Sequence, residues 1–199
     1  MPRAVSKCQN CRKEGHYAST CPDLIVNQVQ EQIPEPEEER TIQEIDITLQ
    51  EDVIQKFRTI VEICHEVSRT LKKGYSEGVY EQAVCIELQE RNIHYTQQEI
   101  IPLQYKNCYI GLIRLDVILT NWLPFILELK AKTGLINSEE KWQLIRYMQR
   151  KNVPYGAVVN FSQSLRGHLQ FGFVVQGENN KYYQYNLETG HGKELIDYS

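Results

Sequence analysis

Residues 115–130 of this 199-residue chain read LDVILTNWLPFILELK. Within this stretch, residues 122–127 carry no charge and follow a turn signal, a pattern typical of a short buried strand. Because side chains alternate along a strand, Glu128 and Lys130 lie on one face at the end of that strand. An apolar strand therefore presents a carboxylate and an ammonium together.

A second carboxylate, Asp116, falls in the preceding run, residues 109–119, which we predict to be a strand. If the turn between the two strands centres near Trp122, Asp116 lies directly opposite Glu128. Like charges at opposed positions are destabilising, and two carboxylates about 4 Å apart repel by about 4 kcal/mol at an effective dielectric constant of 20. A divalent cation would remove that cost, so the pair predicts a metal site. The alternative is a solvated strand face with a weak Glu–Lys ion pair.

Length and composition permit one medium domain plus an appendage. No apolar run approaches the roughly eighteen residues of a membrane span, and the polar N-terminus does not look like a signal peptide. We therefore expect an intracellular protein, cytoplasmic or nuclear, that does not bind membranes. Six cysteines without an export signal indicate thiols or metal ligands rather than disulfides. The oligomeric state stays open.

The net charge of −4 conceals three unequal parts. Residues 1–21 carry four basic and one acidic residue, residues 22–52 carry one basic and ten acidic, and residues 53–199 carry seventeen basic and fifteen acidic. The acidity is confined to the middle part, so the overall charge says little about whether the flanking parts bind nucleic acid.

The N-terminal part contains the spacing C-x2-C-x4-H-x4-C, formed by Cys8, Cys11, His16 and Cys21. Three thiolates and one imidazole make the closed tetrahedral site that structural zinc prefers. Gly15 permits the positive φ that so short a loop requires. A segment this short cannot build a hydrophobic core, so zinc must supply the folding free energy, on the order of 10–16 kcal/mol at neutral pH.

This segment resembles the CCHC zinc knuckle of retroviral nucleocapsid and related RNA-binding proteins. The resemblance implies binding of single-stranded DNA or RNA through basic side chains and an exposed ring on which a base stacks. The side chains available for this are Arg3, Lys7, Arg12, Lys13 and Tyr17. The sequence departs from the usual pattern at Gln9, where an aromatic residue is common, and at Arg12, where glycine is common. A knuckle that contacts another protein is the alternative.

Residues 22–52 include the acidic, proline-containing stretch PEPEEE at residues 34–39. Proline disfavours helix and sheet interiors, and like charges repel one another. We therefore predict that residues 22–52 are an acidic disordered linker between the knuckle and a domain formed by residues 53–199.

Periodicity and turn signals divide that domain into helices and strands. The predicted helices are residues 53–71, 76–91 and 138–151, and the predicted strands are residues 99–105, 109–119, 123–131, 155–161, 170–175 and 181–186. This order predicts an α/β fold with a mixed sheet, in which residues 155–161 run parallel to the strand carrying Glu128. We predict that the apolar surroundings of Cys64, Cys85 and Cys108 place them in the core.

The order of elements, with Asp116 and Glu128-x-Lys130 on its second and third strands, resembles the PD-(D/E)xK, or restriction-endonuclease-like, nuclease superfamily. Residues 74–81 fit G-x-x-E-x-x-Y-E, the signature of its GxxExxY family, and residues 143–147 fit Q-x-x-x-Y, seen in its exonuclease-like branch. The resemblance covers about residues 53–175. It implies a mixed central sheet flanked by helices and metal-dependent hydrolysis of DNA or RNA.

The residue types suit that chemistry. Asp116 and Glu128 offer hard oxygen ligands to Mg²⁺ or Mn²⁺, and Lys130 can orient or deprotonate a water and stabilise charge on phosphorus. The remaining candidates are Glu77 and Glu81 for a further metal contact, with Glu77 slightly favoured, Gln143 and Tyr147 for positioning substrate or Lys130, and Arg114 and Lys132 for binding phosphate. The four histidines outside the knuckle lack metal-ligand spacing, and we assign them no role.

Two interpretations follow from these motifs. The first is a metal-dependent nuclease that carries a single-strand-binding zinc knuckle on a tether. The second is a nucleic-acid-binding or adaptor protein whose nuclease-like domain does not cut. An intact set of Asp, Glu, Lys and Gln favours the nuclease, because a pure binder does not need opposed carboxylates. A viral or mobile-element origin would suit such a fusion, by analogy only.

Overall fold

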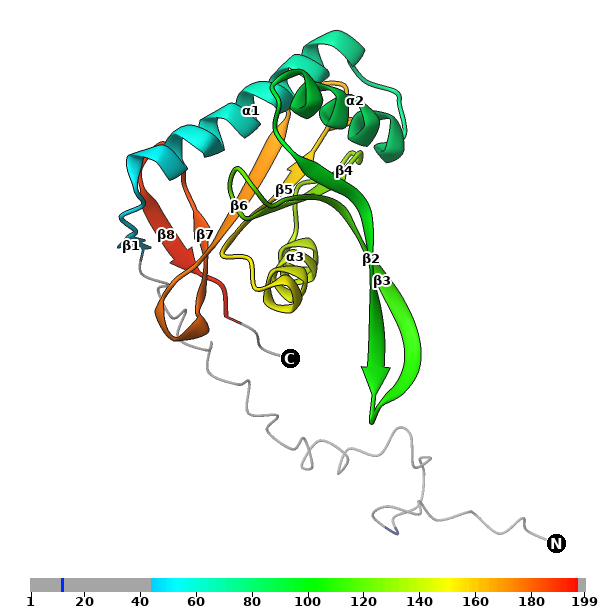
Figure 1. Ribbon diagram of the computed structural model, residues 1–199, viewed down its shortest axis with the longest axis vertical. Helices are drawn as coiled ribbons and strands as arrows, with labels where there is room; N and C mark the ends of the chain where they lie inside the picture. Colours follow the sequence, from blue (N-terminus) through cyan, green and yellow to red (C-terminus); the bar gives the residue numbers. More distant parts are fainter. Residues whose placement is uncertain (1–11, 13–43, 197–199) are drawn as a thin grey trace, which may run out of the picture. The chain divides into compact units, whose positions relative to one another are not determined.

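The computed structural model describes residue 12 and residues 44–196 (Figure 1). Arg12 is exposed and has a positive φ of 61°. The predicted zinc ligands Cys8, Cys11, His16 and Cys21, and the predicted nucleic-acid contacts Arg3, Lys7, Lys13 and Tyr17, lie outside the described residues.

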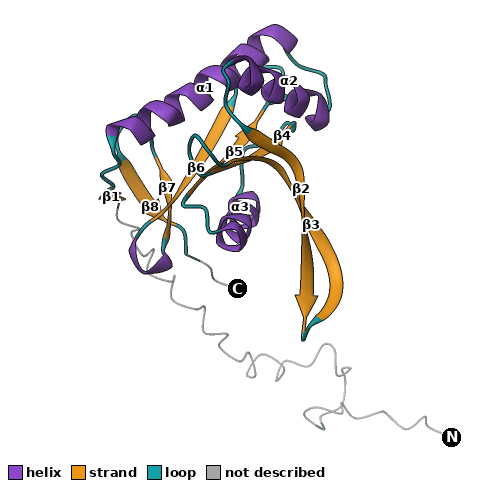
Figure 2. Cartoon of the chain, in the orientation of Figure 1, coloured by secondary structure: helices purple, strands orange, loops and turns teal. Residues whose placement is uncertain are grey.

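Residues 44–196 contain both helices and strands (Figure 2). The helices are α1 (Glu51–Leu71), α2 (Glu77–Glu90) and α3 (Ser138–Lys151), with one 3-10 turn, η3 (Glu178–Asn180). The strands are β1 (Glu44–Asp46), β2 (Tyr95–Tyr105), β3 (Cys108–Leu119), β4 (Phe125–Lys130), β5 (Tyr155–Asn160), β6 (Gln170–Gln176), β7 (Tyr182–Tyr185) and β8 (His191–Glu194). None of these helices is long and apolar enough to cross a membrane.

All eight strands join one sheet in the order β1-β8-β7-β6-β5-β4-β3-β2. Strands β4 and β5 pair in parallel, connected by α3, and the other neighbouring strands in the described sheet pair antiparallel. The predicted α/β class, the mixed sheet and the parallel β4–β5 pair are therefore confirmed.

The helices cover the sheet on both faces, which gives three layers (Figure 1). Helices α1 and α2 pack on one face of the sheet. The apolar residues of α1 recur every three or four positions and so face the sheet, among them the fully buried Phe57 and Ile60. The Phe57 ring stacks on Phe173 of β6 with 5.0 Å between ring centroids. Helix α3 covers the other face, where Leu144 and Met148 are fully buried. The middle of the sheet is thus apolar on both sides, as its uninterrupted apolar strands require.

Two expectations were wrong, and one strand was not predicted. The disordered linker was predicted to continue to residue 52, but Glu44–Asp46 forms a strand paired with β8, and α1 begins at Glu51. Strand β8 was not predicted, because its polar sequence HGKE lacks the apolar residues that mark a strand. Cys108 is exposed rather than buried, since it follows a hairpin turn, whereas Cys64 and Cys85 are buried as predicted.

Strands β2 and β3 form the longest hairpin of the described chain and extend away from the rest of the sheet (Figures 1 and 2). Lys106 and Asn107 form its two-residue turn, and both have positive φ, as the turn type that matches strand twist requires. The register shifts between Leu103 and Gln104, which marks a bulge.

Candidate active site

The antiparallel register of β3 and β4 brings the two predicted carboxylates together. Val117 pairs with Leu127, and the next position along the same register sets Asp116 against Glu128. The backbone N–H of Leu129 donates a 2.8 Å hydrogen bond to Asp116 Oδ2, which holds the carboxylate against β4. Asp116 is 8% exposed and Glu128 is 2% exposed. Two acidic side chains are therefore buried side by side.

Glu128 uses its two oxygens differently. Lys130 Nζ lies 2.6 Å from Glu128 Oε1, and Gln143 Nε2 donates to the same oxygen at 2.9 Å. The other oxygen, Oε2, is buried and accepts no hydrogen bond from any residue of the described chain. A buried polar atom without a partner costs about 1–3 kcal/mol, more when charged, so this oxygen is available to a ligand that the protein does not supply.

Helix α3 brings the predicted Q-x-x-x-Y residues to Glu128. A capping box fixes the start of the helix, with Asn137 accepting from the Glu140 N–H and the Glu140 side chain accepting from the Asn137 N–H. One turn further, Gln143 donates from Nε2 to Tyr147 Oη at 2.7 Å as well as to Glu128. Tyr147 is buried, so it fixes the amide that in turn orients Glu128.

Helix α2 directs its two predicted glutamates to different partners. Glu77 is partly exposed, and its Oε2 lies 4.0 Å from Lys130 Nζ. Glu81 is buried and accepts hydrogen bonds from Gln97 Nε2 at 2.9 Å and from Gln98 Nε2 at 2.6 and 2.5 Å. Glu77 is thus the glutamate that approaches Lys130, while Glu81 is held by the first part of β2.

Gln98 is a residue of this region that the sequence analysis missed. The β2–β3 register pairs Gln97 with Val117 and Glu99 with Leu115, so Gln98 lies opposite Asp116. Its φ is +56°, an uncommon conformation for a residue inside a strand, and it aims the amide at Glu81. Two adjacent glutamines shortly before the apolar pair Ile100 and Ile101 were the available signal.

The remaining predicted contacts differ in availability. Arg114 is exposed on β3, two residues before Asp116. Lys132 Nζ lies 2.7 Å from the Glu140 carboxylate, so its charge is already paired within the chain. Of the two, Arg114 is the better placed to bind a phosphate.

Family comparison adds to this geometry. Residues 52–170, more than half of the chain, match the model of the PD-(D/E)XK nuclease superfamily. The chain belongs to this superfamily. Residues 6–23 match the model of the zinc knuckle, and this range contains Cys8, Cys11, His16 and Cys21. Comparison with curated proteins and with solved structures found no match.

Burial and like charge dominate the electrostatics of the PD-(D/E)XK domain. Burial, followed by repulsion from Asp116, raises the pKa of Glu128 to about 7, although Lys130 opposes the shift. Burial also raises the pKa of Asp116 above its ordinary value, against the hydrogen bond from Leu129. Burial lowers the pKa of Lys130, but Glu128, Glu77 and Asp116 together outweigh burial, so the pKa of Lys130 is raised. The two carboxylates therefore lack the positive charge that would let both ionise easily.

A divalent cation fits this set of donors. No group of three or more His, Cys, Asp or Glu side chains in residues 44–196 forms a complete metal cage. Mg²⁺ rarely uses such a cage, because it retains waters and binds through one or two carboxylates plus substrate phosphates. Asp116 and Glu128, with the unpaired Oε2 of Glu128, supply that partial ligand set.

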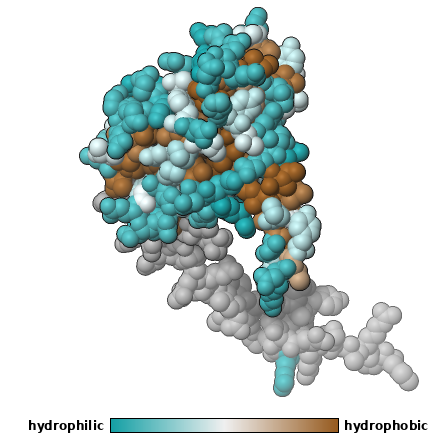
Figure 3. Space-filling view, viewed as in Figure 1, coloured by the Kyte–Doolittle hydropathy of each residue, from teal (hydrophilic) through white to brown (hydrophobic). Residues whose placement is uncertain are grey.

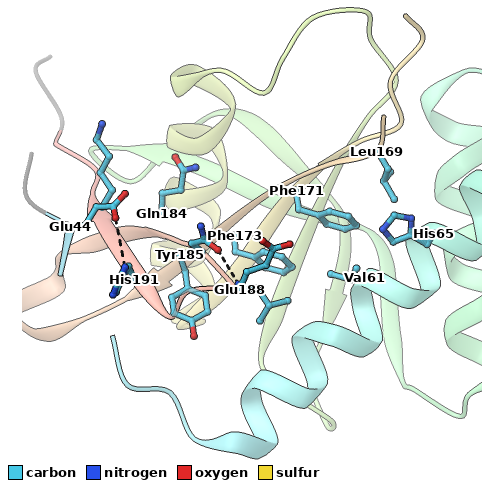
Figure 4. Close-up of a pocket in the computed structure, with 13 residues that line it drawn as sticks. Glu44, Val61, His65, Leu169, Phe171, Phe173, Gln184, Tyr185, Glu188 and His191 are labelled. Carbon is cyan, nitrogen blue, oxygen red and sulfur yellow. Dashed lines mark hydrogen bonds and ion pairs between the residues drawn. The ribbon is translucent and has the colours of Figure 1, made fainter. Parts of the chain in front are cut away.

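Cavities of about 620 and 640 Å³ lie on different parts of residues 44–196. The first is lined by Lys130 and Gln143, which both contact Glu128, and by Trp142 and Arg146, which the sequence analysis did not single out. The other, of about 640 Å³, lies between α1 and strands β6–β8 (Figure 4). Its lining includes His65, Phe171 and His191, and none of the predicted catalytic residues.

Proposed function

We propose that the protein is a metal-dependent nuclease that hydrolyses phosphodiester bonds of DNA or RNA, with Mg²⁺ or Mn²⁺ as the catalytic ion. The observation that carries the proposal is the buried pair of Asp116 and Glu128, with Glu128 Oε2 unpaired and Lys130 2.6 Å from Oε1. A purely binding domain has no physical need to bury two opposed carboxylates.

Each residue of the site has a role in this proposal. Asp116 and Glu128 hold the cation, which when bound polarises the scissile phosphate and lowers the pKa of a water. Lys130 places a positive charge beside them and stabilises the charge that develops on the phosphate oxygens. Gln143, fixed by Tyr147, orients Glu128. Glu77 orients Lys130 and can add a water-mediated metal contact.

We assign the zinc knuckle, with Zn²⁺ as its structural ion, to capture of single-stranded nucleic acid for this site. A second nucleic-acid-binding module on the same chain raises the local concentration of substrate at the candidate active site. This assignment rests on the match of residues 6–23 and on the basic residues within and beside them.

The test is cleavage of end-labelled single- and double-stranded DNA and RNA by the full chain, with zinc kept stoichiometric. Mg²⁺ or Mn²⁺ is added or omitted, and wild type is compared with Asp116→Asn. The control Glu90→Gln removes an exposed carboxylate at the end of α2, outside the site. We expect metal-dependent cutting by wild type and control, and none by Asp116→Asn.

The ladder of products then separates exonuclease from endonuclease action. If none of the four substrates is cut although the protein binds them, the nuclease proposal is wrong and a non-catalytic nucleic-acid-binding function replaces it.

A further inference from the structure

The β2–β3 hairpin exposes an unusual amount of apolar surface. We call residues 100–114, the outer part of this hairpin, the arm. Five large hydrophobic side chains of the arm are more than half exposed, namely Ile100, Tyr105, Tyr109, Ile110 and Leu112. Figure 3 shows hydrophobic side chains at the surface where the hairpin leaves the rest of the domain. Gathered apolar residues of this kind mark an interaction surface, whereas single ones do not.

The arm has one side attached to the domain and one side free. Ile101 and Ile113, which pair with each other across the hairpin, pack against the core cluster under α3. Their neighbours Ile100 and Leu112 are exposed, 60% and 53% respectively, as the alternation of side chains along a strand predicts. The arm is therefore anchored on one face at its base, and both of its faces are exposed at the tip.

Aromatic and basic side chains combine at the tip. Tyr105 and Tyr109 flank the turn on opposite strands and are 62% and 65% exposed. Because Tyr105 pairs with Cys108 and Tyr109 with Gln104, the two rings lie on opposite faces of the tip. Lys106 Nζ, in the turn, lies 5.3 Å from the centroid of the Tyr105 ring. Exposed rings beside basic groups are the combination on which single-stranded nucleic acid stacks, because every base has a π-face and every nucleotide has a phosphate.

The charge of the arm favours nucleic acid over a second copy of the chain. The arm carries Lys106 and Arg114 and no acidic residue, although the whole chain has a net charge of −4. Two copies related by a two-fold axis would bring the same surface together and oppose like charges. A polyanion meets complementary charge on the same surface.

The arm also continues the strands that carry the candidate active site. Arg114 precedes Asp116 by two residues and pairs with Ile100, and Gln98 lies opposite Asp116. The strand between the tip and Asp116 is about 25 Å long at about 3.3 Å per residue. A nucleic-acid strand lying along the arm would thus be led toward the carboxylates.

We propose that the arm binds single-stranded nucleic acid, with Tyr105 and Tyr109 stacking on bases and with Lys106 and Arg114 contacting phosphates. This inference rests on the proposed nuclease function and narrows its substrate to strands that present unpaired bases.

The first measurement is the affinity of the full, zinc-loaded chain for a fluorescein-labelled dT12 oligonucleotide, by fluorescence anisotropy without added Mg²⁺ or Mn²⁺. The double variant Tyr105→Ala/Tyr109→Ala is expected to weaken binding by about tenfold or more. The double variant with phenylalanine at both positions keeps the rings and is expected to bind like wild type. Ile86→Ala removes an exposed apolar side chain on α2 and is the matched control.

Salt dependence tests the phosphate contacts separately. Lys106→Gln is expected to reduce the slope of log K against log salt by about 0.7, the value for one phosphate contact on a single strand.

Cys108 gives a direct footprint, because it lies at the tip and is exposed, whereas Cys64 and Cys85 are buried. Its alkylation rate, measured on the peptide by mass spectrometry, is expected to fall when dT12 is added. An unchanged rate, or equal affinity of the alanine variant and wild type, overturns the proposal whatever the knuckle contributes to binding. If the alanine substitutions instead convert a dimer into a monomer and leave affinity unchanged, the surface binds a second copy.

Hydrolysis of bis(p-nitrophenyl) phosphate with Mn²⁺ separates this proposal from the nuclease proposal. This small diester needs the carboxylates and has no bases for the arm, so the alanine variant is expected to hydrolyse it like wild type, and Asp116→Asn is expected not to. Failure of wild type on both this diester and nucleic acids would refute nuclease activity, while the binding and footprint results would still decide whether the arm binds nucleic acid.

Discussion

Asp116→Asn should abolish cleavage and at the same time stabilise the protein. Asparagine keeps an oxygen that can accept the hydrogen bond from Leu129 N–H, and it removes one of the two buried negative charges. Glu128 would then ionise without a like charge opposite it. The prediction is therefore a gain in the free energy of unfolding from a substitution in the candidate active site, which is the trade-off expected where function maintains strain.

The pKa of Glu128 gives the magnitude. A rise from the ordinary value of 4.5 to about 7 corresponds to roughly 3 kcal/mol at about 1.36 kcal/mol per pKa unit. Burial is the larger cause and repulsion by Asp116 the second, so we assign about 1 kcal/mol to Asp116.

The direction of the pH dependence follows from the raised pKa. The folded protein binds the Glu128 proton more tightly than the unfolded chain, so this contribution to stability is complete below about pH 4.5 and is lost as pH rises through about 7. The gain from Asp116→Asn should therefore be seen at pH 8.5 and nearly vanish at pH 5.

Thermal unfolding followed by tryptophan fluorescence measures this gain. Both tryptophans, Trp122 and Trp142, lie in the PD-(D/E)XK domain, so the signal excludes the knuckle. Without added Mg²⁺ or Mn²⁺, about 1 kcal/mol should raise Tm by about 2–4 °C at pH 8.5. The control Glu90→Gln should change stability by less than about 0.5 kcal/mol. Asp116→Asn that destabilises the domain equally at both pH values would refute the repulsion argument.

Three further perturbations test the site and the sheet. The affinity for Mn²⁺, measured by calorimetry, should fall by about tenfold per pH unit below pH 7, because Glu128 must lose its proton to bind; a flat profile would show that Glu128 is not a ligand. Lys130→Met should reduce kcat for oligonucleotide cleavage by about 100-fold or more while Mn²⁺ still binds, and retention of kcat would remove Lys130 from the mechanism. Gly156→Ala should destabilise the domain by about 1–2 kcal/mol, measured by urea unfolding. The added Cβ would lie 2.9 Å from Leu144 Cδ1 and 3.1 Å from the Ile126 carbonyl oxygen. An unchanged unfolding midpoint would mean that α3 shifts without cost.

The local sequence pattern was sufficient to predict a helix or strand where the element is long and its apolar residues recur at a clear period. Helix α3 begins and ends at the predicted residues 138 and 151, because a capping box precedes it and Asn152 in the left-handed conformation follows it. The position of Asp116 opposite Glu128 was predictable for a similar reason, since a single turn sets the register of β3 and β4.

What the sequence did not reveal depends on contacts between distant segments. Strands β1 and β8 are short and polar, so they become strands only by pairing with each other and with β7. Glu77 and Glu81 share one face of a helix, and only the position of β2 decides which of them reaches Lys130. No sequence pattern predicts the positive φ of Gln98, because glutamine rarely adopts that conformation.

The pairing of β1 with β8 has a consequence for folding order. Glu44 of β1 pairs with Lys193 of β8, so β1, the first strand of the described residues, can pair only after β8, the last of them, has been synthesised. Contacts this distant in sequence slow folding, because a long loop must close before they form. The edge of the sheet at β1 should therefore close last, after the centre around β4 and β5 has formed. A nascent chain that lacks β8 would leave β7 as an open edge, and this stage of synthesis is where we expect the protein to be most prone to aggregation.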